Sequence, residues 1–336
     1  MTHPACDERP LWDLLFGHLG FRALLVAHQL GLFEALAAEP RTLRELCEAL
    51  GVERRAARAL VAPCVACGLL EARDGLYELA PVAREYLVAA SPSPFAGFLD
   101  MLIANEDVFS TRAVRAAVEQ NASQVFGGDP LFASLEQQTA LAHAFTRGMH
   151  GHSAGAARAW PELVELSAHR VLLDVAGGSG VHAVAAARRW PHLSAIVLDR
   201  PAVLEVAREV VADADLADRV AVHGADVWSD PFPSADLHFY ADVFHDWPPE
   251  KGRFLARKSF ESLPAGGTIV VHEMLFDEDK HRPLAAAAYN LAMLVWTEGQ
   301  QYSGRELVAL LAEAGFQDVR ARPALGYWSV VTGRKP

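Results

Sequence analysis

The sequence of 336 residues predicts an α/β protein in which a helical amino-terminal domain precedes a doubly wound sheet. Three observations lead to this fold class. From Val171 onward, short β-branched runs alternate with helical segments, which is the rhythm of successive βαβ units. The first of these runs, 171–175, passes through a glycine-rich turn into an alanine-rich helix. The preceding residues instead show helical periodicity. We expect three parts, residues 1–90, 91–165 and 166–336.

Residues 1–90 have the order helix, helix, hairpin, which is typical of a winged-helix domain that is all-helical apart from its hairpin. Thr42-Leu-Arg-Glu45 is a capping box that opens one helix, and Arg54–Cys67 forms the next. Asp74-Gly75 between two apolar runs predicts the hairpin turn. In the helical segment 11–36, one apolar face is formed by Leu15, Leu19, Ala23, Val26 and Leu30. Because glutamates balance the nearby arginines, we interpret the domain as a dimerisation module rather than a DNA reader.

Residues 91–165 read as a helical linker with a break near Gly127–Pro130. Aromatic and methionine side chains recur along it, as either core or the wall of a substrate pocket. The set is Phe98, Met101, Asn105, Phe109, Phe132, Phe145 and Met149.

Composition narrows the function classes. A net charge of −12 argues against nucleic acid or an anionic membrane as the main partner. Four cysteines lie in the first fifth of the chain, and the pair Cys64-Val-Ala-Cys67 has no second pair to complete a zinc site. We expect reduced thiols and, without a visible signal peptide, a cytoplasmic protein.

The glycine turn carries the strongest chemical signal. Asp174 interrupts the buried run 171–175, and Gly177, Gly178 and Gly180 follow it, allowing a ligand to approach the backbone. The same glycines also satisfy a dinucleotide pattern. A pyrophosphate, however, needs helix N–H groups and no nearby anion, whereas a carboxylate suits a positively charged ligand such as S-adenosylmethionine. The turn therefore favours S-adenosylmethionine over NAD.

Two further strands end in acids that extend this predicted cofactor site. The strand 195–198 ends at Asp199, where a ribose hydroxyl needs an acceptor. The next element ends in Asp226-Val227-Trp228, whose apolar pair could sandwich an adenine. Two residues at the ends of neighbouring strands complete the set, Arg200 and Ala241.

The fourth strand, 235–241, delivers His245 into a loop at the carboxyl edge of the sheet, where doubly wound folds bind ligands. A histidine with an ordinary pKa near ~6.5 suits a general base at neutral pH. Alternatively, His245 and Asp246 could form a surface pair, or Asp246 could cap the helix 250–263. Glu273, at the end of the strand 268–273, and Glu298 are candidate acidic partners of the imidazole.

These residues together resemble one family. Asp174-Val-Ala-Gly-Gly-Ser-Gly180, Asp199, Asp226-Val-Trp228, His245-Asp-Trp247 and Leu263-Pro-Ala-Gly-Gly267 are similar to motifs of the S-adenosylmethionine-dependent O-methyltransferases of the plant caffeic acid and acetylserotonin type. The resemblance covers nearly the whole chain. It implies a Rossmann-like methyltransferase domain, a homodimer that exchanges amino-terminal helices, and a small acceptor of specialised metabolism.

Carried over by residue, the resemblance makes His245 the base and Glu273 one of two acidic partners. The second acid falls on Gln301, with Glu298 acidic but three places early. Met149 and Ser153 match a segment that lines the substrate pocket and approaches the cofactor. The other implied substrate residues are Phe98, Met101, Asn105, Phe145, Asp246, Asn290, Met293, Leu294 and Trp296.

Three alternatives remain open at this stage. His245 could help a metal chelate a keto acid for carbon methylation, although the predicted set includes no metal ligand. Methyl transfer to nitrogen or carbon could proceed by proximity. A winged-helix ligand sensor is the remote alternative, because the segment 53–66 has arginines only near its start. The motifs specify the family rather than the acceptor.

Overall fold

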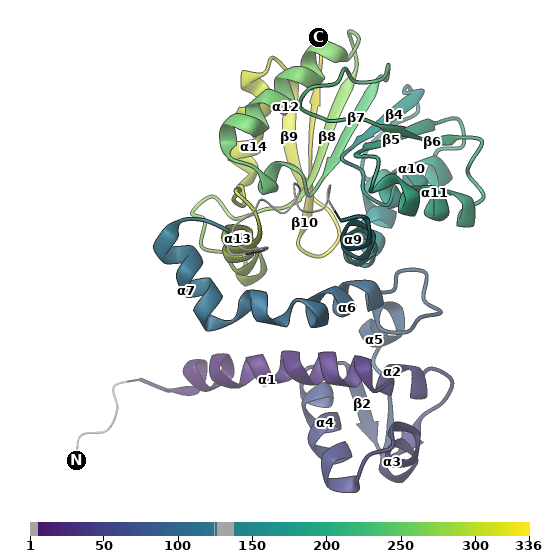
Figure 1. Ribbon diagram of the computed structural model, residues 1–336, viewed down its shortest axis with the longest axis vertical. Coiled ribbons are helices and arrows are strands. Elements are labelled where there is room, and N and C mark those ends of the chain that lie inside the picture. Colours follow the sequence, from purple (N-terminus) through teal and green to yellow (C-terminus); the bar gives the residue numbers. More distant parts are fainter. Residues whose placement is uncertain (1–5, 124, 126–137) are drawn as a thin grey trace. The chain divides into compact units, whose positions relative to one another are not determined.

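The computed structural model describes residues 6–123, 125 and 138–336. The predicted break at Gly127–Pro130 and Phe132 lie outside these residues. The chain divides into two compact units, 1–103 and 104–336 (Figure 1). The predicted division into three parts stays a prediction.

The amino-terminal unit is a winged helix. Its small sheet has the order β1-β3-β2, and Asp74 and Gly75 take φ values of 50° and 79°, as the predicted hairpin turn requires. The predicted capping box at Thr42 and Glu45 is present, and all four cysteines are free. The elements are α1 (Arg9–Gln29), α2 (Leu32–Ala35), β1 (Arg41–Thr42), α3 (Leu43–Leu50), α4 (Arg54–Ala66), β2 (Leu70–Arg73), β3 (Leu76–Leu79), α5 (Pro81–Tyr86) and α6 (Ala96–Ala104).

Helix α1 leaves much apolar surface open. Ala23, Leu25 and Ala27 pack into the core of the unit. By contrast, Leu14 is 73% exposed and Phe16 is 58% exposed. By length and composition α1 is also apolar enough to cross a membrane, a test that core helices and signal sequences pass as well. The exposed face is what a dimerisation helix needs.

The second unit is built on a seven-stranded sheet with the order β6-β5-β4-β7-β8-β10-β9. The strands from β6 to β8 are parallel and β10 is antiparallel to both of its neighbours. The order reverses on either side of β4, where doubly wound sheets open a ligand crevice. Strand bounds are β4 (Val171–Val175), β5 (Ser194–Asp199), β6 (Val220–Gly224), β7 (Leu237–Ala241), β8 (Thr268–Met274), β9 (Gln317–Pro323) and β10 (Trp328–Arg334).

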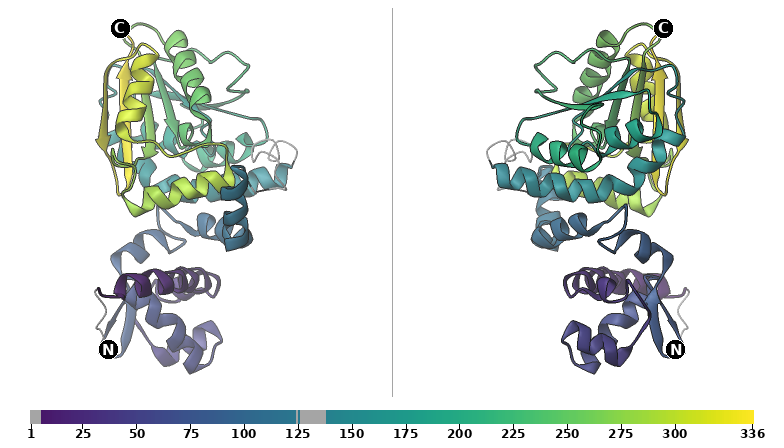
Figure 2. Two further views of the ribbon diagram at one scale, coloured as in Figure 1. Left: turned by 90° about the vertical axis from the view of Figure 1, so that its left-hand side faces the viewer. Right: turned by 90° about the vertical axis from the view of Figure 1, so that its right-hand side faces the viewer.

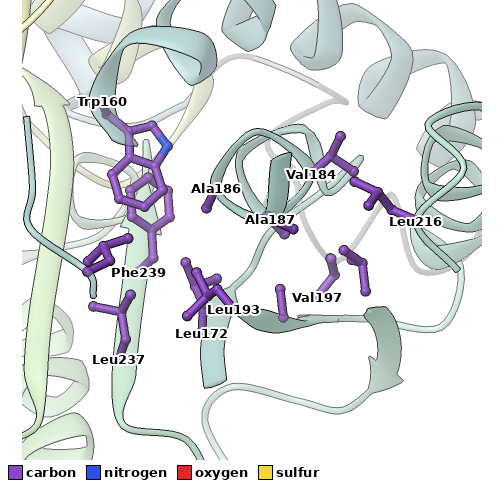
Figure 3. Packing of buried hydrophobic residues seen from close by; sticks show 14 of the residues in the cluster. Trp160, Leu172, Val184, Ala186, Ala187, Leu193, Val197, Leu216, Leu237 and Phe239 are labelled. Carbon is purple, nitrogen blue, oxygen red and sulfur yellow. The ribbon is translucent and has the colours of Figure 1, made fainter. Parts of the chain in front are cut away.

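Helices cover both faces of this sheet, as the apolar runs predict. Adjacent residues of β4 face opposite ways: Leu172 packs towards α10 and α11, and Leu173 packs towards α12 and α14. On the first face Trp160 stacks on Phe239 at 4.2 Å between ring centroids (Figure 3). These helices are α10 (Val181–Arg189), α11 (Leu204–Asp213), α12 (Pro249–Ser262) and α14 (Gly304–Glu313).

Two further helices, α9 (Thr139–Ala159) and α13 (Leu284–Trp296), lie along the end of the sheet where the parallel strands finish (Figures 1 and 2). Along the chain, α13 lies between β8 and α14. The remaining segments are η1 (Glu106–Phe109), α7 (Thr111–Gln120), η3 (Trp160–Glu162) and η4 (Phe244–Asp246). α9, α13 and η4 together surround the carboxyl ends of β7 and β8.

Candidate active site

The glycine turn after β4 is held by close approaches that exclude larger residues. A Cβ on Gly177 would lie 2.7 Å from Cγ of Asp174, and one on Gly180 would lie 2.9 Å from Cγ2 of Val197. Gly180 also has a φ of 72°, which favours glycine. Gly178 donates its N–H to Oδ2 of Asp199 at 2.8 Å, so the turn is tied to the end of β5.

The two acids at this turn are buried without a positive partner among the described residues. Asp174 is 1% exposed, and its Oδ2 makes no hydrogen bond to the described part of the chain. Burial raises the pKa of Asp174 to about 7. Burial also raises the pKa of Asp199 to about 6, against the hydrogen bonds from the Gly178 and Arg200 amides. Such a pair favours a ligand that brings donors and positive charge.

The acid after β6 forms a tight turn. Oδ1 of Asp226 accepts the N–H of Trp228 at 2.9 Å. The half-buried Trp228 ring meets Trp247 edge to face at 5.0 Å, and the Lys251 ammonium lies 4.1 Å from the Trp247 ring. The carbonyl of Val227 accepts from Lys258. An aromatic surface therefore stands beside the turn, as an adenine site requires.

His245 lies in η4, just beyond β7, and is 2% exposed. Glu273 of β8 fixes both the turn and the ring. Its Oε1 accepts the backbone N–H of Phe244 at 3.0 Å, and its Oε2 lies 2.9 Å from Nδ1 of His245. The neighbouring residue His272 faces the other side of β8 and stacks on Trp328. Successive residues of a strand face opposite sides of the sheet, so Glu273 points towards His245 and His272 points away from it.

Gln301, in the loop between α13 and α14, contacts the same imidazole nitrogen. Its Oε1 lies 3.3 Å from Nδ1 of His245, and the side chain is fully buried. Oδ1 of Asn290 on α13 accepts the backbone N–H of Gln301 at 2.9 Å and so holds the loop in place. The amide can accept a hydrogen bond from the ring but carries no charge.

Two aspartates flank the ring. Asp246 Oδ1 lies 3.6 Å from Nε2 of His245, and Asp242 Oδ1 lies 4.0 Å from Nδ1. Asp246 does not cap α12, whose N-cap is Pro248 without a side-chain bond. One ligand atom each from Asp242, His245 and Glu273 lies within 4.8 Å of the others, so these groups could also hold a divalent cation.

The acids change the proton affinity of the imidazole. Burial lowers the pKa of His245, but Glu273, Asp246 and Asp242 outweigh it and raise the pKa to about 10. Burial also raises the pKa of Asp246 to about 7 and that of Asp242 well above its ordinary value. The expectation of an ordinary histidine pKa is therefore wrong, because so many carboxyl groups crowd one buried ring.

Comparison with known proteins identifies the fold's relatives. A family model for the O-methyltransferase domain matches residues 111–317, and one for the O-methyltransferase dimerisation domain matches residues 12–89.

The chain belongs to the O-methyltransferase family.

Individual relatives span almost the whole chain. A 3-hydroxy-5-methyl-1-naphthoate 3-O-methyltransferase of Streptomyces sahachiroi is 36% identical, over 92% of this chain and 90% of its own. An L-tyrosine C(3)-methyltransferase of Streptomyces lavendulae is 30% identical, over 92% and 87%. The structure of human N-acetylserotonin methyltransferase in complex with SAM superposes with a TM-score of 0.86 at 26% identity, covering 99% of both chains.

In this O-methyltransferase, Glu298 stands apart from His245. Its carboxylate pairs with Lys251 at 2.9 Å and is half exposed, so the structure does not bring it to the imidazole. The acid that is three places early in sequence thus serves a surface pair.

The predicted acceptor residues divide between the two units. In the second unit Phe145 of α9 and Trp296 of α13 approach each other at 6.4 Å, and Phe109 reaches Trp296 from η1. Met293 is buried, Ser153 is nearly so, and Met149, Leu294, Asn290 and Asn105 are half-buried. Phe98 and Met101 belong to the amino-terminal unit, where Phe98 packs on Phe95. Ala241 is half-buried where β7 ends.

Sequence reasoning gave no role to three residues that lie around His245, namely Asp242, His152 and Tyr289. The Tyr289 ring meets His245 edge to face at 5.2 Å and lies 5.9 Å from the ring of His152. The available signal for Asp242 was its place three residues before His245 in a short turn.

Proposed function

We propose that the protein transfers a methyl group from S-adenosylmethionine to a hydroxyl group of a small aromatic metabolite, with His245 as general base. The observation that carries the proposal is the burial of His245 against Glu273 at the end of β7. This edge of the sheet also holds the glycine turn and its two buried acids.

The buried residues at the turn fit S-adenosylmethionine. The bound cofactor supplies an electrophilic methyl group on a sulfonium. Asp174 offers a buried carboxylate oxygen with no hydrogen-bond partner in the described chain, which suits the ammonium of the cofactor. Asp199 is the acceptor for ribose hydroxyls, and Asp226, Val227 and Trp228 are placed to receive the adenine. Gly177, Gly178, Gly180, Ser153, Arg200 and Ala241 complete the proposed cofactor set.

The base then acts through a defined nitrogen. Nδ1 hydrogen-bonds to Oε1 of Gln301 and lies 2.9 Å from the Glu273 carboxylate, so Nε2 is the nitrogen left to take a proton. The acceptor O–H gives this proton to Nε2 while its oxygen forms the new bond to carbon. The bound cofactor would supply the methyl carbon and would keep the electron pair of the broken carbon–sulfur bond. Glu273 stabilises the imidazolium that results, and burial keeps water from competing.

The acceptor class follows from the aromatic rings at the same end of the sheet. Phe109, Phe145 and Trp296 form a surface that suits a flat ring system. The naphthoate acceptor named for a relative belongs to this class. Phe98, Met101, Asn105, Met149, Asp246, Asn290, Met293 and Leu294 complete the proposed acceptor set.

Assembly is the second part of the proposal. The dimerisation-domain match and the exposed apolar face of α1 support a homodimer whose amino-terminal helices cover each other. A cytoplasmic location is proposed with it, and neither a nucleic acid nor a membrane is needed as partner.

Methyl transfer to carbon or nitrogen is the second candidate. It is favoured by the relative that methylates C3 of tyrosine and by the three groups that could hold a cation. A chelator separates the candidates, because metal-assisted transfer would be lost on chelation and restored by a divalent ion.

The direct test is an assay of the purified protein with labelled S-adenosylmethionine and a panel of hydroxylated naphthoates and phenols. We expect an O-methylated product and S-adenosylhomocysteine in equal amounts. Each acceptor is matched with its O-methylated analogue as the control. Turnover of the blocked analogue, or a product methylated at carbon, would overturn hydroxyl methylation.

A further inference from the structure

Asp242 is the acidic group that the base shares with a second imidazole. Its Oδ1 lies 4.0 Å from Nδ1 of His245 and its Oδ2 lies 3.7 Å from Nδ1 of His152. The side chain is 7% exposed. Its φ of 55° is in the left-handed region, which residues other than glycine rarely adopt. Strain of this kind persists where the surroundings fix it, as at functional sites.

The chemistry at Nδ1 is incomplete without this carboxylate. Glu273 gives one negative charge, and Gln301 gives only an amide oxygen. Asp246 lies on the opposite nitrogen, where the acceptor must approach. When the ring takes a proton in a buried site, a second anion on the Nδ1 side offsets the cost of the new positive charge.

We propose that Asp242 is the second acidic positioning residue of His245, acting on the nitrogen that the neutral Gln301 also contacts. This inference rests on the proposed function, because it assigns a partner to the proposed base. The turn fixes the backbone of Asp242, whose N–H donates to the carbonyl of His272 at 3.2 Å, and Oδ2 of Asp242 lies 3.7 Å from Nδ1 of His152.

The first test is Asp242→Asn, which keeps the shape and tolerates a left-handed backbone. We expect kcat to fall about 10- to 100-fold, less than the ~10²–10⁴-fold that a whole general base contributes. KM for the acceptor and the dissociation constant of S-adenosylhomocysteine should change less than about twofold. Asp215→Asn is the matched control, since Asp215 is exposed and has a φ of 54° between α11 and β6.

The second test moves the charge. In Asp242→Asn/Gln301→Glu, a carboxylate replaces the amide whose oxygen already lies 3.3 Å from Nδ1. We expect kcat to recover at least about tenfold over the single variant, whereas a role confined to holding the turn would give no recovery. If Asp242→Asn does not fold, Asp242→Gly fits the same backbone and is measured in the same two backgrounds.

The failures are distinguishable. Wild-type kcat in Asp242→Asn, or a loss that Gln301→Glu leaves unchanged, overturns the role of Asp242 while a severe defect in His245→Ala leaves the base in place. Full activity in His245→Ala instead removes the proposed base, and with it the premise of this inference.

Discussion

The two ends of the site use the same group in opposite ways. At β4 and β5, Asp174 and Asp199 are buried carboxyl groups with raised pKa values and no cation among the described residues. At β7 and β8, Glu273 and Asp242 are buried around His245, which supplies the cation from within the chain. On the proposed function, the first pair of acids faces a cationic ligand, whereas the second pair balances the imidazolium that His245 forms.

Removing the imidazole of His245 should have the largest effect on kcat. His245→Ala should lower kcat by about 10²–10⁴-fold, because no other described side chain is held at the end of β7 between Glu273 and Asp246. Steady-state kinetics would measure the loss, and calorimetry should find the affinity for S-adenosylhomocysteine nearly unchanged. An equal loss of affinity would mean that the ring belongs to the cofactor site.

Neutralising Asp174, which has no cation beside it among the described residues, should change the stability of the ligand-free protein. The folded-state pKa of Asp174 is raised from 3.8 to about 7, so the folded protein loses stability as the pH rises through that window. At pH ~8, Asp174→Asn should therefore stabilise the ligand-free protein by up to about 4 kcal/mol, from about 1.4 kcal/mol per pKa unit.

The same substitution should weaken S-adenosylhomocysteine binding, which calorimetry would measure beside thermal unfolding. The stabilisation should vanish at pH ~3.5, where the aspartate is protonated as well. A variant that is less stable at both pH values would show that the carboxylate holds the fold rather than a ligand.

Glu273 and Gln301 both contact Nδ1 of His245, and their substitutions should lower kcat by different amounts. Glu273→Gln should lower kcat about 10- to 100-fold, because the amide can still accept the Phe244 N–H but cannot balance the imidazolium. Gln301→Ala should cost less, since it removes a neutral acceptor at 3.3 Å. Kinetics of both variants, with thermal unfolding to control for folding, would decide. The reverse ranking would move the main partner to Gln301.

The sequence predicted the parts of the site that follow from chain-local patterns. Asp174 directly precedes the glycine turn, and Val171–Val175 and Thr268–Glu273 are apolar enough to be predicted as strands whose ends lie on one edge. The family pattern suggested Gln301 and Glu298 as alternatives, and only the fold separates them, since Lys251 holds Glu298 at the surface. That pairing joins α12 to a loop 47 residues later, which no local pattern encodes.

The raised pKa of His245 could not be predicted from the sequence either. A raised pKa depends on how many carboxyl groups meet one ring, and Asp242 reaches it through an unusual left-handed turn. Sequence spacing gives the order of residues along η4 but not the direction of each side chain. The role of Asp242 therefore became visible only with its two distances to histidine nitrogens.

The smallest expected effect is on the pH dependence of kcat, which reports the protonation state of His245. Only the neutral ring accepts a proton, and Glu273, Asp246 and Asp242 overcome burial to raise the His245 pKa to about 10. Below that pKa the neutral fraction grows about tenfold per pH unit. A bound sulfonium opposes the imidazolium and lowers this pKa, so kcat should rise across pH ~7–9 but by less than tenfold per unit.

Asp246→Asn sharpens this last prediction. Asp246 Oδ1 lies 3.6 Å from Nε2 and helps to raise the His245 pKa, so its loss should move the rise in kcat to lower pH. Rate profiles at saturating cofactor, together with NMR titration of the His245 ring in the ligand-free protein, would measure both shifts. A profile that is flat above pH ~7 and unmoved by Asp246→Asn would mean that the ring is already neutral and that the surrounding acids are protonated instead.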